Sequence, residues 1–321
     1  MIDRRTLIGA AAALPIARPA LAQAPAGETP TPWPPAEHID LWPGRAPGAP
    51  ATLPILAPSM NGRPGLRELW LRGVAVPTIG VFRPARPDGR AVLSLPGGGY
   101  SFVSIENEGL DVARALTPHG ITVFALAYRL PGEGWANRAD VPLQDAQRAM
   151  RLIRSRAGRL GIDPAKLGIV GFSAGGPLAA SLSVGHGDRV YPPVDAADRL
   201  SARPAFSGLV YPVTSVRGSP TAPSILLGPD PSAATQARYD TPPRVTAETP
   251  PAFIAHALDD RVVAFEQPMA YLTAAQAARV PVEAHFFERG GHGFGGMHSP
   301  ADAPSRRWTE LFALWTGQLG R

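Results

Sequence analysis

Short apolar runs alternate with amphipathic stretches along the central and C-terminal parts of the chain. Four to six mostly apolar residues in succession, bounded by turn-forming residues, predict a buried strand. Such strands are expected at residues 78–82, 91–95, 122–127, 167–170, 206–211, 252–257 and 282–287. Apolar side chains at helical spacing predict helices over 109–116, 265–278 and 305–318, and a further helix after Asp140.

The helix after Asp140 shows the clearest helical period. Asp140 stands where a side chain can cap the first turn, and Pro142 falls within that turn. Apolar residues then recur on one face, at positions 143, 146, 150, 153 and 157. Strands that are apolar on both faces and alternate with helices indicate a mostly parallel sheet with helices on both sides. We therefore expect an α/β fold that binds its ligand beyond the carboxyl ends of the strands.

Proline marks the organisation of the rest of the chain. Residues 23–64 are rich in proline and lack periodicity, which predicts an extended arm that either wraps the domain or stays mobile. The apolar cluster at 39–44 is expected to dock on the domain, so that the arm is partly ordered. Residues 65–321 contain no internal repeat or linker and are expected to form one domain. Within them, 212–251 is rich in Pro, Ser and Thr, and is either an insertion over the mouth of the site or a plain surface excursion.

The first 22 residues have the features of an export signal. Arg4 and Arg5 precede a short run of small apolar residues, and the sequence at 20–22 fits a signal-peptidase site with cleavage after Ala22. Paired arginines are typical of the twin-arginine route, so the mature chain would begin at Gln23 in the periplasm or outside the cell. The apolar run is too short to span a bilayer. The alternative is a cytosolic protein with a frayed basic start.

Composition narrows the possible chemistry. The chain has 321 residues, of which 45% are hydrophobic, enough for a sizeable core. It has no cysteine, which excludes disulfides, thiolate metal sites and a cysteine nucleophile. The net charge of +5 comes from dispersed arginines, with Lys166 the only lysine, and does not indicate nucleic-acid binding. No metal or organic cofactor is implied, and the oligomeric state is not predicted.

The segment Gly171-Phe172-Ser173-Ala174-Gly175 lies between an expected strand and an expected helix. A Gly-x-Ser-x-Gly in this context predicts the nucleophile elbow of a serine hydrolase. The chain turns so sharply that the flanking residues crowd one another, which favours glycine there. The turn would expose the serine hydroxyl and aim the following N–H, at a helix start, toward developing negative charge. The alternative is a glycine-rich structural turn with an inert serine.

A serine hydroxyl needs a base, usually a histidine oriented by a carboxylate, and on this fold the acid and then the histidine follow the serine. His292 lies in the glycine-rich loop 290–295 after the last strand and is the predicted base, with His298 a weaker candidate. His186 follows the elbow too closely, and His256 and His285 lie within expected strands.

Two adjacent aspartates follow the strand at 252–257. Asp260 is the predicted acid and Asp259 the alternative, because neighbouring residues on a turn point in different directions. The aspartate that does not face His292 is expected to cap the turn or to pair with Arg261.

The oxyanion of an acyl-transfer reaction needs a second backbone donor beside Ala174. Residues 96–100 follow the strand at 91–95, where lipases and esterases place that donor, and three glycines leave their N–H groups uncovered. Gly98 and Gly97 are the predicted donors. The alternative is a tight loop that contacts no ligand.

These motifs together resemble the α/β-hydrolase superfamily. Within it the chain is similar to the esterase branch that includes acetyl xylan and feruloyl esterases. The resemblance extends from about residue 39 to the C-terminus and is carried by the segments 41–44, 95–100, 106–109, 144–149, 171–176, 256–263 and 290–295. Two positions depart from this branch, which often has histidine where Pro177 stands and proline where Ala264 stands.

The resemblance implies a serine esterase that forms an acyl-enzyme on Ser173, with acetyl or feruloyl esters of plant polysaccharide as substrates. The signal at 1–22 would make it an exported enzyme. Its partners would be small-molecule or carbohydrate esters, with no nucleic acid and no embedding in a membrane. A prolyl-oligopeptidase-like peptidase has a similar elbow, but usually carries a large propeller domain for which this chain has no room. A hydrolase homologue that binds carbohydrate without turnover is the second alternative.

Overall fold

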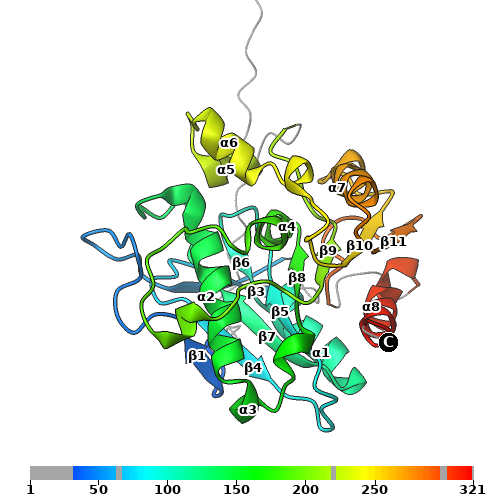
Figure 1. Cartoon of the computed structure of the whole chain (residues 1–321), viewed down its shortest axis with the longest axis horizontal. Helices are drawn as coiled ribbons and strands as arrows, with labels where there is room; N and C mark the ends of the chain where they lie inside the picture. Colours follow the sequence, from blue (N-terminus) through cyan, green and yellow to red (C-terminus); the bar gives the residue numbers. More distant parts are fainter. Residues whose placement is uncertain (1–31, 63–66, 218–221, 297–301, 320–321) are drawn as a thin grey trace, which may run out of the picture.

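An eight-stranded sheet, in the order β1-β4-β7-β5-β8-β9-β10-β11, forms the centre of the molecule. The computed structural model describes residues 32–62, 67–217, 222–296 and 302–319 (Figure 1). The strands are β1 (His38–Asp40), β4 (Thr78–Phe82), β5 (Ala91–Leu95), β7 (Thr122–Ala127), β8 (Leu167–Phe172), β9 (Ser207–Val210), β10 (Ala252–Ala257) and β11 (Val282–Phe287). The β1–β4 and β4–β7 pairs are antiparallel and the remaining pairs are parallel. The predicted α/β fold with a mostly parallel sheet is confirmed.

Two hydrophobic cores lie on the two faces of this sheet. Successive residues of a strand point to opposite faces. Leu93 and Ile169 accordingly belong to one core and their neighbours Val92 and Val170 to the other. The first core packs against α2 (Val141–Ser155), α4 (Gly175–Gly185) and α7 (Glu266–Ala277), and the second against α1 (Asp111–Leu116) and α8 (Trp308–Thr316). A short helix, α3 (Ala157–Leu160), follows α2. Burial on both faces explains why the strands in the middle of the sheet, from β7 to β10, read as continuous apolar runs.

The N-terminal arm contributes to the fold. Its strand β1 forms one edge of the main sheet, and Leu41 and Trp42 are buried beside it. The Trp42 indole N–H donates to Asp145 Oδ1 at 2.9 Å, which fixes the arm to α2. A second sheet of three antiparallel strands, β2 (Ala57–Asn61), β3 (Glu68–Arg72) and β6 (Val103–Ser104), was not expected.

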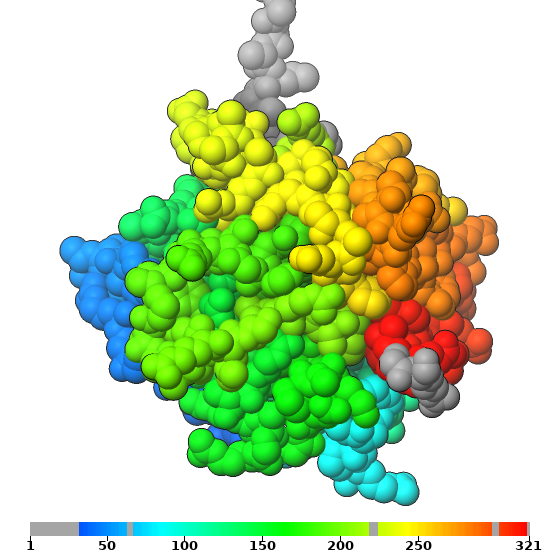
Figure 2. Space-filling view, in the orientation of Figure 1, coloured from blue at the N-terminus to red at the C-terminus, as the bar shows by residue number. Residues whose placement is uncertain are grey.

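The segment after β9 folds into two short helices, α5 (Ala222–Leu227) and α6 (Ala233–Tyr239). The Arg138 Nε donates to the Ile225 carbonyl at 2.8 Å, and the Tyr239 hydroxyl donates to Asp140 Oδ1 at 2.5 Å. Asp140 therefore makes no capping bond to α2, and the prediction that it caps this helix is wrong. Its carboxylate holds α6 instead. In Figure 2 the yellow residues of this segment stand raised at the upper end of the molecule.

Several predicted boundaries shift by one or a few residues. The helix expected at 109–116 begins with a π-helical turn, η1 (Glu106–Leu110), before α1. The helix expected at 305–318 consists of a 3₁₀ turn at Pro304–Arg307 followed by α8. Among the described residues, no helix has both the length and the apolar character that crossing a membrane requires. The predicted export signal at 1–22 and His298 lie outside the described residues.

Candidate active site

Ser173 lies at a sharp turn between β8 and α4, with a φ of +49°. A Cβ at Gly171 would lie 2.2 Å from the Gly175 carbonyl oxygen, and one at Gly175 would lie 2.0 Å from the Leu95 carbonyl oxygen. Any side chain at either position would therefore collide with backbone. This crowding is the physical reason for both glycines of the motif, and it leaves Ser173 at the carboxyl edge of the sheet.

His292 connects Ser173 to Asp260. The His292 Nε2 lies 2.9 Å from Ser173 Oγ, and its Nδ1 lies 2.8 Å from Asp260 Oδ2. The Asp260 side chain is fully buried and that of His292 is 19% exposed. With Asp260 ionised, the N–H is held at Nδ1, so Nε2 is free to accept the serine proton.

The carboxylate of Asp260 is stabilised in its charged form. Burial by itself raises the pKa of Asp260, but the hydrogen bonds from His292 and from the N–H groups of Val262 and Val263 outweigh burial, and the pKa is lowered. The same turn therefore positions the acid and keeps it ionised.

Asp259 points away from Asp260 and holds a different loop. Its Oδ1 accepts hydrogen bonds from the N–H groups of Gly290 at 2.9 Å and Gly291 at 2.7 Å. The expectation that this aspartate caps its own turn or pairs with Arg261 is wrong, because Asp260 itself caps the turn. Asp259 instead fixes the start of the glycine loop that carries the base.

The glycine loop after β5 lies directly beside the elbow. A Cβ at Gly97 would lie 2.8 Å from Ser173 Cβ. The Gly97 N–H donates to Glu108 Oε2 at 2.5 Å, so it is not free to bind an oxyanion, and the prediction of Gly97 as a donor is corrected on this ground. Gly98 has a φ of +120° and no room for a Cβ, which would lie 2.1 Å from the Phe102 carbonyl oxygen.

The N–H groups of Gly98 and Ala174 have no hydrogen-bond acceptor within the described ranges, and the same holds for Gly99. Gly99 has a φ of +59°, and a Cβ built on it would meet open space. Gly99 was not singled out from the sequence, because three consecutive glycines do not reveal which N–H a neighbouring side chain will occupy.

No other described histidine is hydrogen-bonded to Ser173 or Asp260, although His256 lies close enough to Asp260 and His292 for their charges to act on it. His256 is buried in β10, where burial lowers its pKa. His285 in β11 lies 3.1 Å from Glu283 through its Nε2. The pKa of His186, after α4, is lowered by burial and by Arg203. No group of three or more His, Asp or Glu side chains within the described residues could hold a metal ion.

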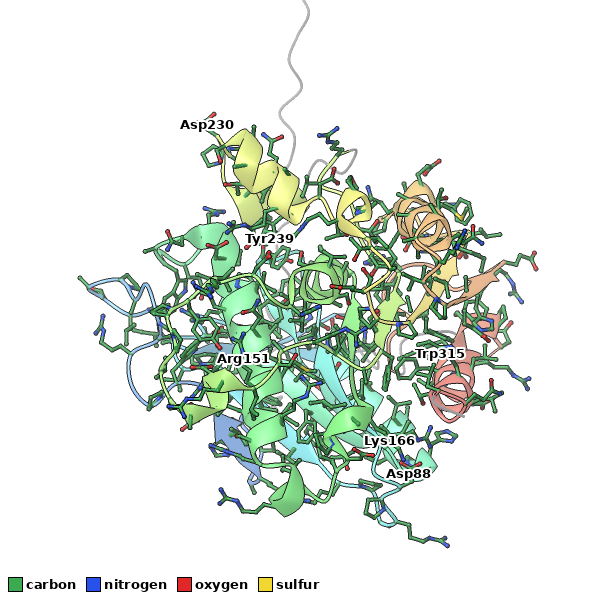
Figure 3. All side chains as sticks on the ribbon, viewed as in Figure 1. Asp88, Arg151, Lys166, Asp230, Tyr239 and Trp315 are labelled. Carbon is green, nitrogen blue, oxygen red and sulfur yellow. The ribbon has the colours of Figure 1, made fainter. Side chains whose placement is uncertain are left out.

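A cavity of about 650 Å³ lies at the opposite edge of the sheet and is separate from this site. Its lining includes Asp88, Arg90 and Lys166, which precede the strands rather than follow them. In Figure 3 the labelled Asp88 and Lys166 lie at the far end of the molecule from Tyr239 of α6. Ser173 follows the carboxyl end of β8, whereas Lys166 precedes its amino end.

Comparison with known proteins identifies the class. Residues 92–296 match a family described as the alpha/beta hydrolase fold, and the chain belongs to this family. An acetylxylan esterase of Xylanibacter ruminicola is 35% identical over 223 residues, which make up 67% of this chain and 43% of that protein. The chain spans less than half the length of the curated relatives that it matches.

Solved structures extend the similarity over more of the chain. An acetyl ester-xyloside bifunctional hydrolase from Caldicellulosiruptor lactoaceticus has 28% identity and a TM-score of 0.69, covering 88% of this chain and 96% of that one. A propionate-bound esterase from Thermogutta terrifontis has 26% identity and a TM-score of 0.63, covering 76% of this chain and 90% of that one. The expected resemblance to acetyl xylan esterases is confirmed.

Proposed function

We propose that the protein is a serine hydrolase of carboxylic esters. The observation that supports this most directly is the hydrogen-bonded line from Ser173 Oγ through His292 to Asp260. Ser173 Oγ attacks the ester carbonyl while His292 Nε2 takes its proton. The N–H groups of Gly98 and Ala174 stabilise the oxyanion, and each well-placed donor contributes about 3 kcal/mol.

Collapse of the tetrahedral intermediate releases the alcohol, which receives its proton from His292. Water then attacks the acyl-serine with His292 as base, and the acid product leaves as Ser173 regains its proton. Asp260 holds the imidazole in the tautomer that both steps require and stabilises the imidazolium formed in each. These steps need only the groups of this chain, the ester and water.

Acetylated plant polysaccharide is the proposed natural substrate. The support comes from the relatives, which include an acetylxylan esterase and an acetyl ester-xyloside hydrolase. Export through the twin-arginine signal at 1–22 would place the protein where such polymers occur. The N-terminal sequence of the secreted protein tests export, because a start well away from Gln23 would reject the cleavage site.

Turnover by the wild type and by Ser173→Ala tests the reaction. The substrates are p-nitrophenyl acetate, p-nitrophenyl butyrate, acetylated xylan and a prolyl anilide. We expect ester hydrolysis by the wild type alone and no release from the anilide. Equal turnover by the variant would reject Ser173 as nucleophile, cleavage of the anilide would favour the peptidase, and no turnover of any ester would favour a binding protein.

A further inference from the structure

Glu108 is a buried carboxyl group that the proposed reaction does not use. It lies in the π-helical turn η1 and is 4% exposed. Its Oε2 accepts the hydrogen bond from the Gly97 N–H, and its Oε1 accepts one from the Tyr211 hydroxyl at 2.8 Å. No Lys or Arg among the described residues forms an ion pair with Glu108. The negative charge of Glu68 repels a negative charge on Glu108 and so raises its pKa. A carboxyl buried without a cation is costly, and π-helical turns often occur at functional sites.

Tyr211 continues the chain of hydrogen bonds to the loop that carries the base. Its hydroxyl oxygen accepts a hydrogen bond from the Gly295 N–H at 2.9 Å. Its ring centroid lies 4.9 Å from that of His292, in an edge-on arrangement. Tyr211 is fully buried and has a φ of +38°, a conformation that costs a non-glycine residue free energy and often marks a functional position.

Asn107, the neighbour of Glu108, makes a second connection to the same loop. Its Nδ2 donates to the Gly293 carbonyl at 3.1 Å, and its Oδ1 accepts from the Gly296 N–H at 3.0 Å. The turn η1 therefore contacts the glycine loop beside Ser173 on one side and the loop of His292 on the other.

The geometry points to Glu108 as a positioning residue that sets the oxyanion donors through the Gly97 N–H and sets His292 at its working distance through Tyr211. This inference rests on the proposed esterase function. Because the Gly97 N–H donates to Glu108, the glycine loop after β5 is held in one orientation. The next N–H, that of Gly98, is left free to bind the oxyanion. A misplacement of about 1 Å in a catalytic group can cost on the order of 10²-fold in rate.

The test compares four variants on p-nitrophenyl acetate, with active sites counted by a p-nitrophenyl phosphonate that labels the serine. Tyr211→Phe removes the hydroxyl and keeps the ring, and Glu108→Ala removes both hydrogen bonds. Glu108→Gln keeps an acceptor for Gly97 and can donate to the Tyr211 oxygen. Ser94→Ala is the matched control, because the Ser94 hydroxyl donates only to the backbone carbonyl of Glu108.

We expect kcat per labelled site to fall roughly 10²-fold in Tyr211→Phe and Glu108→Ala, with KM nearly unchanged. Affinity for a boronic acid that mimics the tetrahedral intermediate should fall in parallel. Glu108→Gln should recover most of the lost kcat, and Ser94→Ala should retain it.

A purely structural role would lower the number of labelled sites or the melting temperature and leave kcat per site intact. That result, or a Glu108→Gln variant as slow as Glu108→Ala, would overturn the inference. If Glu108→Ala does not fold, kcat per labelled site in Tyr211→Phe decides whether the inference stands. Failure of the proposed function has a different signature, namely equal turnover by the wild type and Ser173→Ala.

Discussion

The substitution Glu108→Gln should change how stability depends on pH. Burial, assisted by the negative charge of Glu68, raises the pKa of Glu108 from its ordinary 4.5 to about 8. The native state thus holds a proton on Glu108 over a pH range in which the unfolded chain has released it. A group whose pKa is raised in the folded state contributes stability that is fully present below about pH 4.5 and is lost as the pH rises through about 8. Glutamine resembles the protonated carboxyl and has no proton to lose.

The size of this change in stability follows from the pH interval between the two pKa values of Glu108, about 4.5 in the unfolded chain and about 8 in the native protein. Each pH unit within it lowers the free energy of unfolding of the wild type by about 1.4 kcal/mol through this one group. Between pH 5.5 and pH 7.5 the wild type should therefore lose about 3 kcal/mol relative to Glu108→Gln. All other titrating groups are shared by the two proteins, so most of their contribution cancels in the difference.

Urea unfolding at pH 5.5, 6.5, 7.5 and 8.5, followed by tryptophan fluorescence, measures this difference. We expect the free energy of unfolding of Glu108→Gln, relative to that of the wild type, to rise up to about pH 8 and then to level off. A gap that stays constant from pH 5.5 to pH 8.5 would mean that Glu108 is already ionised in the native protein, and would refute the reasoning. Equal m-values in the two proteins are the control for a two-state comparison.

Three further predictions concern other parts of the molecule. Asp260→Asn should lower kcat by roughly 10³–10⁴-fold through the wrong imidazole tautomer, whereas Asp259→Asn should cost far less, and steady-state kinetics of both variants would distinguish them. Gly98→Ala places a Cβ 2.1 Å from a backbone oxygen, so the loop must shift and move the oxyanion donor, and kcat per site labelled by the phosphonate should fall. Tyr239→Phe removes the hydrogen bond to Asp140 and should lower the free energy of unfolding by about 1 kcal/mol, with faster hydrogen exchange in α6 and unchanged kcat on p-nitrophenyl acetate.

The elements that could be predicted from the sequence are those buried on both faces. The runs at 91–95, 122–127 and 252–257 coincide with strands, since a central parallel strand is largely apolar. The run at 282–287 also coincides with a strand, although β11 lies at the edge of the sheet and is only half-buried. The strand β3 alternates half-buried and buried positions and has charged residues at both ends, so no continuous apolar run marks it. Asp140 fits a helix cap by local sequence, but its partner Tyr239 lies 99 positions away.

In the active site, too, contacts between residues far apart in the sequence could not be predicted from a local pattern. The elbow motif selects Ser173, and a glycine-rich loop after the last strand selects His292 among the histidines that follow the serine. The structure brings the two residues to hydrogen-bond distance. Which of the two adjacent aspartates faces the histidine depends on the local conformation of the turn after β10, and the sequence left both alternatives open. The occupied N–H of Gly97 depends on Glu108, 11 positions away, whose burial no local pattern indicates.

Backbone strain and side-chain support are concentrated together in this site. Tyr100, Ser173 and Tyr211 all have positive φ, and they follow three strands that are neighbours in the sheet, β5, β8 and β9. Each such residue costs on the order of 1–3 kcal/mol, which persists only where the surroundings hold the conformation. The two hydrophobic cores hold these residues from both faces of the sheet. Glu108 accepts a hydrogen bond from the glycine loop after β5, and Asp259 accepts two from the glycine loop that carries His292. The loops therefore gain the close approach that glycine allows without the mobility that glycine would otherwise bring, because the buried carboxyl group of Glu108 and the exposed one of Asp259 fix their N–H groups.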